Sequence, residues 1–228
     1  MNAILVVIGT AFGCLFKGEK LKTIGDRVFQ GFGLFTMVLG ISGALDISHP
    51  LLELASLVLG TAIGETVDLD DKFNRIGTYF QNKFSKGDDR FASSFISGAL
   101  LFCVGSMSIM GALQAGLENQ HSIYYTKGVL DCCSSAIFAM GGGIGVGFAS
   151  IVVILYQGGL TALASLLQPI MVSEIVALST SVGSLALIGL GLNMLGITKL
   201  KVANFLPAMF VPIVYQAIVV AFNLKGLM

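Results

Sequence analysis

The chain has 228 residues, of which 55% are hydrophobic and only 11% are charged, with a mean hydropathy of +0.88. A soluble domain averages about 25% charged residues, so the surface of this protein has too few charges to face water on all sides. The composition therefore indicates an integral membrane protein. The net charge of +0 excludes the basic surface that a nucleic-acid-binding protein needs, so we expect no nucleic-acid partner.

The sequence lacks the familiar motifs of enzymes. It contains no Walker motif, HExxH, GxSxG or CxxC, so we expect neither an enzyme nor a cofactor. The four cysteines, Cys14, Cys103, Cys132 and Cys133, resemble neither a zinc motif nor a disulfide framework. The first apolar run lacks a basic start and a cleavage site, so we expect it to be retained in the mature protein.

The apolar runs predict an all-α, multi-pass membrane protein that forms a single transmembrane domain over 1–228. A helix that crosses a membrane needs about 20 mostly apolar residues. This length predicts about eight crossings, at 2–16, 28–46, 51–67, 92–117, 127–147, 148–168, 171–195 and 203–223. A broken or re-entrant helix in the glycine-rich stretch 141–147 would reduce the number to seven or fewer.

The basic residues predict the orientation of the chain. Lys and Arg cluster in 17–27, 72–90 and 199–201, whereas the turns at 46–50 and 118–127 contain at most one. Loops rich in Lys and Arg usually face the cytoplasm. We therefore expect both termini on the outer side of the membrane.

Two segments of the first half resemble each other. IGTAFG at 8–13 recurs as LGTAIG at 59–64, and KLKTIG at 20–25 recurs as KFNRIG at 72–77. These matches predict two related two-span units, 3–47 and 54–117, followed by a second half, 127–223, of unassigned symmetry. The alternative is that small residues recur because they are common in helix packing.

Five glycines occupy the seven residues from Gly141 to Gly147. Each glycine costs a helix about 1 kcal/mol relative to alanine, and an unwound backbone within a membrane is stable only beside protein or a wet cavity. Such a break would free backbone groups that bind ions or a small anion. Close packing between helices is an equally reasonable explanation.

A few ionisable or polar residues lie in apolar segments, where the default interpretation is function. Asp131, Ser134 and Ser135 fall near one helix face and would suit Na⁺ or a proton, with the Lys127 ammonium able to extend outward. The alternative is a simple Lys127–Asp131 pair that anchors the end of a helix. The stretch from Glu53 to Glu65 is too short to span about 30 Å of hydrocarbon. Either at least one of these two carboxylates is drawn inward, and we then expect Glu65, or the membrane is locally thin.

The hypothetical substrate and ion site combines these residues with others in apolar runs. Glu174 shares a helical stripe with Ser181, and Asn193 can bridge helices or bind a cation through its oxygen. The full set is Asp131, Ser134, Ser135, Glu65, Thr61, Gly141, Gly142, Gly143, Gly145, Glu174, Ser181 and Asn193. Separately, the pattern of 68–90 predicts a cytoplasmic amphipathic helix at the membrane surface, with docking of a partner as the alternative.

Several longer motifs resemble a known family. They are GTAIG at 60–64, LLFCVGSMSIMGALQAGL at 100–117, KGVLD at 127–131, GLNMLGI at 191–197 and NFLPA at 204–208. Together they resemble the bacterial inner-membrane family of unknown function that includes YqgA and YdfK. The resemblance implies a multi-pass protein of the bacterial inner membrane, often described as transporter-like, and provides no established substrate or site residues.

These observations favour a small secondary transporter that uses an Na⁺ or H⁺ gradient to move a small neutral or monoanionic solute. The partners we expect are the lipid bilayer, the solute and the coupling cation, and association into a homo-oligomer remains open. An ion or solute channel is the first alternative. A membrane structural or assembly factor is the second.

Overall fold

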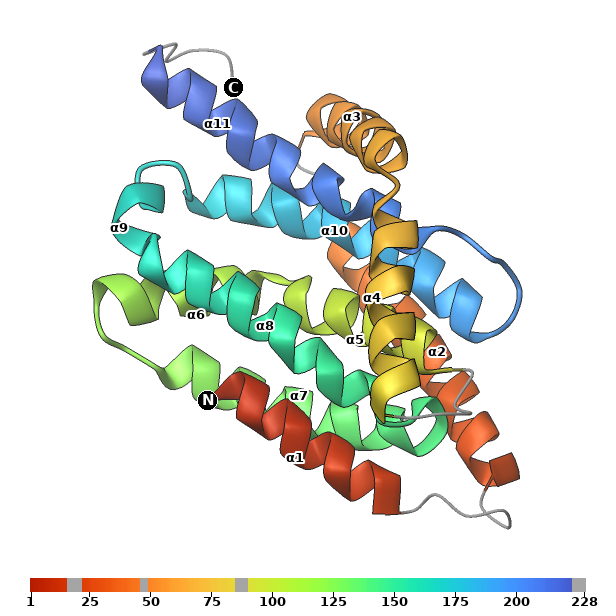
Figure 1. Cartoon of the computed structure of the whole chain (residues 1–228). Helices are drawn as coiled ribbons and strands as arrows, with labels where there is room; N and C mark the ends of the chain where they lie inside the picture. Colours follow the sequence, from red (N-terminus) through yellow and green to blue (C-terminus); the bar gives the residue numbers. More distant parts are fainter. Residues whose placement is uncertain (16–21, 46–48, 85–89, 223–228) are drawn as a thin grey trace.

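The computed structural model describes residues 1–15, 22–45, 49–84 and 90–222, and its regular elements are helices (Figure 1). They are α1 (Asn2–Leu15), α2 (Lys22–Ala44), α3 (Pro50–Val67), α4 (Leu69–Phe84), α5 (Phe91–Cys103), α6 (Ser106–Leu117), α7 (Ser122–Gly142), α8 (Gly145–Ala162), α9 (Ala164–Leu167), α10 (Ser173–Met194), the 3-10 helix η2 (Val202–Phe210) and α11 (Val211–Ala221). The predicted all-α fold is confirmed for these residues.

Every predicted crossing contains a helix, but the number of crossings is not confirmed. Among the described residues, four helical segments are long and apolar enough to cross a membrane: α3, α8, α10 and η2 with α11. α5 and α6 make a fifth if they form one bent span. α1 has only 14 residues, and the charged residues of α2 and α7 lower their hydropathy. Eight crossings therefore remain a prediction.

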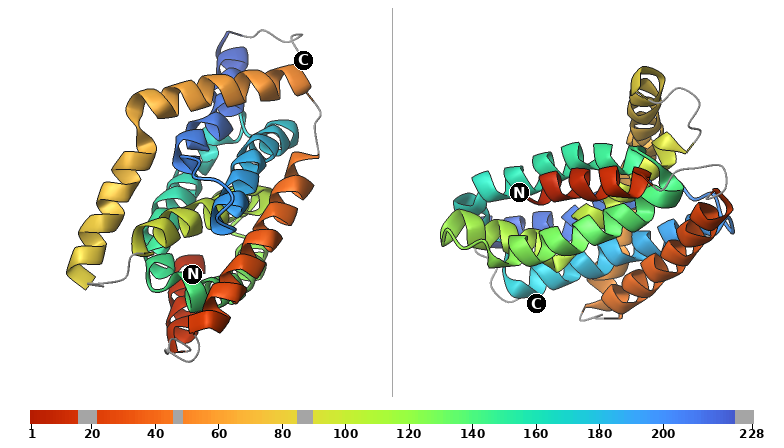
Figure 2. Two further views of the ribbon diagram at one scale, coloured as in Figure 1. Left: turned by 90° about the vertical axis from the view of Figure 1, so that its right-hand side faces the viewer. Right: turned by 90° about the horizontal axis from the view of Figure 1, so that it is seen from below.

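Small residues bring the helices into close contact. A Cβ atom at Gly9 of α1 would overlap the carbonyl oxygen of Cys132, and one at Gly13 would overlap that of Ala136. α1 therefore runs parallel to α7, beside which it lies in Figures 1 and 2. Small residues let backbones approach in this way within membranes.

The second GTAxG sequence, in α3, has the same packing role as the first. A Cβ atom at Gly60 would overlap the backbone of Ala208, and one at Gly64 would overlap the carbonyl oxygen of Asn204. Both copies thus place a glycine pair, four residues apart, against a neighbouring helix. Because packing alone can select this pattern, the duplication of the two-span units stays a prediction.

α3 is inclined steeply to the rest of the bundle. Figure 1 shows it nearly end-on, whereas α7, α8 and α10 run across the view, and Figure 2 (left) shows it from the side. Its buried stripe consists of Glu53, Ser56, Gly60 and Gly64. The remaining apolar side chains of α3 are largely exposed, as expected of a helix that faces lipid.

The glycine-rich stretch 141–147 is a tight turn between two helices, as the predicted boundary between 127–147 and 148–168 requires, and the alternative of a broken or re-entrant helix is not what the structure shows. α7 ends at Gly142 and α8 begins at Gly145. Gly143 between them has φ +80°, a conformation that favours glycine. A Cβ atom at Gly141 or Gly145 would overlap backbone of α2 or α5, so these glycines serve turn formation and close packing.

The amphipathic segment forms α4, and residues 85–89 of the predicted range lie outside the described residues. Two of its aromatic side chains pack on the bundle, with Phe73 beside Phe95 of α5 and Phe80 beside Phe148 of α8. Ile76 and Tyr79 are exposed. The amphipathic pattern therefore reflects packing on the bundle, and its position relative to the membrane surface stays a prediction.

Candidate functional site

Five buried polar side chains from four helices form one hydrogen-bonded group, which we call the central polar network. Its members are Asn2 of α1, Ser108 of α6, Lys127 and Asp131 of α7, and Gln157 of α8, and none is more than 7% exposed. Charged and amide groups at such burial are uncommon. In an apolar helical protein, they mark a functional site by default.

Asp131 is the centre of this network. The ammonium of Lys127 lies 3.1 Å from Oδ1 and 2.9 Å from Oδ2 of Asp131. Asn2 donates from Nδ2 to Oδ2 of Asp131 at 2.8 Å and to Oε1 of Gln157 at 3.2 Å. The amide of Gln157 lies 3.5 Å from the Ser108 hydroxyl. The network thus runs without interruption from the α7 ion pair to the first turn of α6.

The network ends where a helix is broken. α5 and α6 are bent by 60° about Val104 and Gly105, and Gly105 has φ +130°. The Ser108 hydroxyl donates to the carbonyl oxygen of Phe102 at 3.1 Å, which satisfies one of the carbonyls that the end of α5 leaves unpaired. A broken helix with a buried polar group at its break is the arrangement by which many membrane carriers bind solutes.

The network retains unused hydrogen-bonding capacity. Oδ1 of Asn2 is buried and has no partner among the described residues, and the same holds for the hydroxyl of Tyr156, next to Gln157. Tyr124 lies beside the network, with its hydroxyl 3.1 Å from that of Thr161 and 3.4 Å from the carbonyl oxygen of Gln157. Buried polar groups are usually paired, so these orphan oxygens point to a polar ligand or to water.

The structure does not assemble the predicted Na⁺ site at Asp131, Ser134 and Ser135. Lys127 pairs with the Asp131 carboxylate, which is the alternative of a simple Lys–Asp pair, and its ammonium is buried and not directed outward. The hydroxyl of Ser135 donates to the carbonyl oxygen of Cys132 within α7, and Ser134 is half-buried. Among the described residues, no three His, Cys, Asp or Glu side chains could hold a metal ion.

The predicted glycines lie apart from the network. Gly141, Gly142, Gly143 and Gly145 form the turn after α7, and Gly141 is ten residues, or about 15 Å, beyond Asp131 along the helix. The carbonyl of Gly141 instead accepts from Arg90, which also pairs with Asp26. The turn is therefore part of the helix packing at the opposite end of α7.

Glu65 is not the inward carboxylate, because the structure buries Glu53 in its place. The Glu65 side chain is 60% exposed and accepts from Asn204 at 2.6 Å. Glu53 is only 6% exposed and accepts from Ser181 at 3.1 Å. Glu53 falls on the buried stripe of α3 and Glu65 does not. The helical register with Gly60 and Gly64 was the sequence signal that distinguishes them.

The remaining predicted residues have local partners. Glu174 pairs with exposed His49, and Asn193 bonds the backbone of Leu200 and the Thr198 hydroxyl. Thr61 is half-buried on α3, and its hydroxyl has no partner in the described part of the chain. None of these three joins the central polar network through a hydrogen bond that the structure records.

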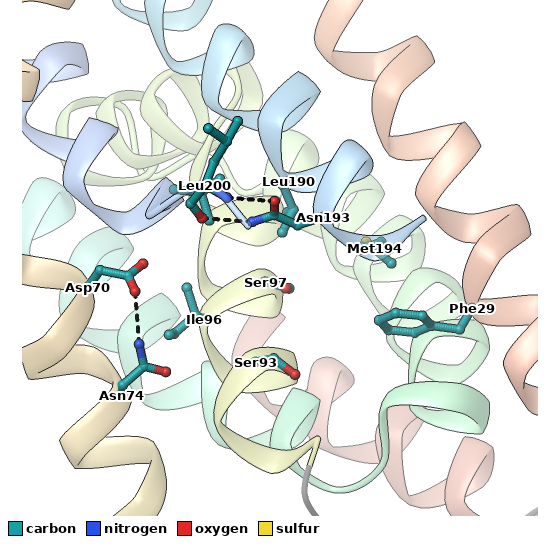
Figure 3. A pocket seen from close by; sticks show the side chains of 11 residues that line it. Phe29, Asp70, Asn74, Ser93, Ile96, Ser97, Leu190, Asn193, Met194 and Leu200 are labelled. Carbon is teal, nitrogen blue, oxygen red and sulfur yellow. Dashed lines mark hydrogen bonds between the residues drawn. The ribbon is translucent and has the colours of Figure 1, made fainter. Parts of the chain in front are cut away.

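A polar crevice opens at the end of the bundle that carries the basic residues. It has a volume of about 190 Å³ and lies between α4, α5 and α10, with Asp70, Ser97 and Asn193 in its wall (Figure 3). A second crevice of about 350 Å³ adjoins it and includes Arg90. α5 extends from these crevices to the break at Val104 and Gly105, so one helix links the opening to the network.

An exposed charge cluster ties α3 and α4 to the start of η2. Lys201 lies 3.2 Å from Asp68 and 3.5 Å from Glu65. The hydrogen bond from the Lys201 ammonium lowers the pKa of Asp68, and the same bond raises the pKa of Lys201. Because the cluster is exposed, we expect it to contribute little to stability.

The helical build, the apolar spans and the buried network together define a multi-pass α-helical membrane protein. The chain belongs to the family described as "Protein of unknown function (DUF554)", whose profile matches residues 1–217. It is 30% identical over 197 residues to the uncharacterized membrane protein YdfK of Bacillus subtilis (strain 168), covering 85% of this chain and 83% of the relative.

A second relative is the uncharacterized protein YqgA of Escherichia coli (strain K12). The chain is 30% identical to it over 200 residues, which is 85% of each chain. The family resemblance inferred from the sequence motifs is thereby confirmed. No solved structure matches the chain.

Proposed function

We propose that this protein is a secondary transporter for a small neutral or monoanionic solute, driven by an H⁺ or Na⁺ gradient. The observation that carries the proposal is the coincidence of the α5–α6 break with the central polar network. Carriers commonly place the solute near the middle of the membrane, at helices interrupted there. α5 and α6 contribute 13 and 12 residues on either side of the break, which puts it at the midpoint of the bent span.

The chemistry of the network favours a small solute with little net charge. Lys127 and Asp131 neutralise each other, and Asn2 and Gln157 add amides that both donate and accept. The first turn of α6 adds backbone N–H groups without helical partners. A single carboxylate on the solute would suit Lys127 and these amides. A multiply charged anion would not, because the network has one cation.

The orientation of the chain is part of the proposal. Arg90 and Lys201 lie at the end of the bundle where the crevices open. If this basic end faces the cytoplasm of the bacterial inner membrane, the crevices form the inner entrance and both chain termini lie outside. Tyr124 and Thr161 then lie on the outer side of the buried network.

The test begins with a solute screen. The thermal stability of the purified protein is measured against metabolites and ions, and solutes that raise the melting temperature are offered to proteoliposomes with an H⁺ or Na⁺ gradient. We expect saturable, gradient-driven uptake that Asp131→Asn abolishes and that the exposed control Asp71→Asn leaves intact. The proposal would be contradicted if the rate of uptake were the same with and without each ion gradient. Normal uptake by Asp131→Asn would contradict it as well.

A channel and an assembly factor remain the competing functions. A channel needs a continuous path, and single-channel current steps in a planar bilayer would support it. An assembly factor predicts a co-purifying protein and no flux. Asn2, Asp131 and Gln157 bond one another between α1, α7 and α8, which favours an occluded carrier site over an open pore.

A further inference from the structure

A second buried polar site lies between α3 and α10, separate from the central polar network. Ser181 of α10 donates to Oε2 of Glu53 at 3.1 Å. The other carboxylate oxygen, Oε1, is buried and has no hydrogen-bond partner in the described chain, and neither has the hydroxyl of Ser56, which is 0% exposed. Ser56 follows Glu53 by about one helical turn, so both face the same side.

No counter-cation faces Glu53 from the described helices packed against it. Glu174, at the start of α10, is that helix's one charged residue, and Tyr215 is the titratable residue of α11. η2 has no titratable residue, Glu65 lies at the opposite end of α3, and the charged residues of α4 lie beyond that end. An ionised carboxylate buried without a partner is costly. A bound cation would remove that cost and satisfy Oε1.

We infer that Glu53 is a proton-binding residue, and that it carries the coupling cation of the proposed transporter. The proton would bind at Oε1, the carboxylate oxygen that has no partner among the described residues. A proton fits better than Na⁺, which needs several more oxygens. The carbonyls of α3 and α10 around Glu53 and Ser181 are engaged in unbroken helices and are not free to coordinate it.

The position of Glu53 relative to the GTAxG sequence of α3 supports a role matched to the solute site. In the register that aligns Gly9 with Gly60, Asn2 of α1 aligns with Glu53 of α3. Both side chains lie on the buried stripe of their helix, two turns before the glycine pair. Asn2 bonds Asp131 in the central polar network, whereas Glu53 bonds Ser181. Equivalent positions thus hold the solute network and the cation site.

The surroundings also provide an entrance for the proton. His49 and Glu174 are in hydrogen-bonding contact at the starts of α3 and α10, with side chains 35% and 44% exposed. His49 precedes Glu53 by one helical turn, and its carbonyl accepts from the Glu53 N–H at 3.0 Å. A proton taken from water at this pair needs to move only about one turn, about 5 Å, to reach the carboxylate.

The proton-binding step can be tested without knowing the solute, although the coupling role rests on the proposed function. Infrared difference spectra are recorded between acidic and alkaline buffer on the full-length protein in nanodiscs, with isotope-labelled glutamate. The wild type is expected to show the C=O band of a protonated glutamic acid. In Glu53→Gln, the band should lose the intensity contributed by one protonated carboxyl group. In Glu65→Gln and Glu174→Gln, that intensity should remain.

A second variant keeps the carboxyl and removes its donor. Ser181→Ala should shift the Glu53 band to higher frequency, because a hydrogen bond to the C=O group lowers its stretching frequency. Ser184→Ala, one turn along α10, is the matched control and should leave the band in place. Size-exclusion chromatography checks that each variant is folded.

An unchanged band in folded Glu53→Gln, or equal spectra for Ser181→Ala and Ser184→Ala, would overturn the inference. The transport proposal fails by a different result, namely uptake that is indifferent to ion gradients or to Asp131→Asn. The two failures are therefore distinguishable.

Discussion

The side-chain amide of Asn2 lies 2.8 Å from the carboxylate of Asp131. The two residues are 129 positions apart in the sequence and meet where α1 packs against α7. The same amide reaches Gln157 on a third helix. One short side chain thus connects α1, α7 and α8 at the point where α6 begins. This connection helps explain how an ion pair can be stable within an apolar bundle, since Lys127 and Asn2 both bond the Asp131 carboxylate.

The Lys127–Asp131 pair should be strongly coupled. Asp131→Asn or Lys127→Met leaves one buried charge without its partner, and we expect each to destabilise the protein by about 3–5 kcal/mol. The double variant should lose much less than the sum of the two. A double-mutant cycle on unfolding in detergent measures the coupling.

The exposed pair of Arg75 and Asp71 on α4 serves as the control for this cycle, because its side chains are 80% and 46% exposed. Its coupling should stay below about 0.5 kcal/mol. Additive losses at Lys127 and Asp131 would show that the two residues do not act as a buried pair.

Gly105 should be intolerant of a side chain. Its φ of +130° is rarely adopted by other residues, and Gly105→Ala should cost about 1–3 kcal/mol of stability and weaken solute binding. Nothing lies within 4 Å of a Cβ atom at Gly31 in α2, which provides the matched control. Gly31→Ala should be neutral or stabilise by about 0.4–1 kcal/mol. The melting temperatures of the two variants compare these effects, and equal shifts would argue against a strained break.

The two GTAxG sequences should respond alike to substitution. Gly9→Ala and Gly60→Ala each place a methyl group against a neighbouring backbone, and overpacking of this kind costs about 1–3 kcal/mol. Ala11→Leu and Ala62→Leu alter exposed positions of the same helices and should have little effect. Thermal unfolding in detergent compares the four variants. Tolerance at Gly60 with loss at Gly9 would refute the shared packing role.

The sequence was sufficient for the class of protein and for the approximate place of each helix. Apolar length located every segment, because that signal is local. It misplaced Lys127 and Glu65, because the burial of a long charged side chain depends on partners supplied by other helices. Asn2 and Gln157 were missed for the same reason, although an amide in the apolar run of α8 was a signal.

The glycines also show that a local sequence pattern does not determine how tertiary packing arranges the chain. Their number in 141–147 correctly indicated that a continuous helix was unfavourable, but not whether the chain turns or unwinds. The actual break, at Gly105, has one glycine after Val104 and left little trace in composition. Its φ is fixed by the packing of α5 and α6 on α8, which involves residues far apart in the chain.

The most direct test of the account is the affinity of the purified protein for the solute that best stabilises it. Ser108→Ala removes a hydroxyl of the central polar network, and Ser106→Ala removes an exposed one two residues away on the same helix. We expect Ser108→Ala to weaken binding about tenfold or more, the equivalent of one buried hydrogen bond, and Ser106→Ala to bind normally. Equal affinity in both variants would contradict a solute site at the α5–α6 break.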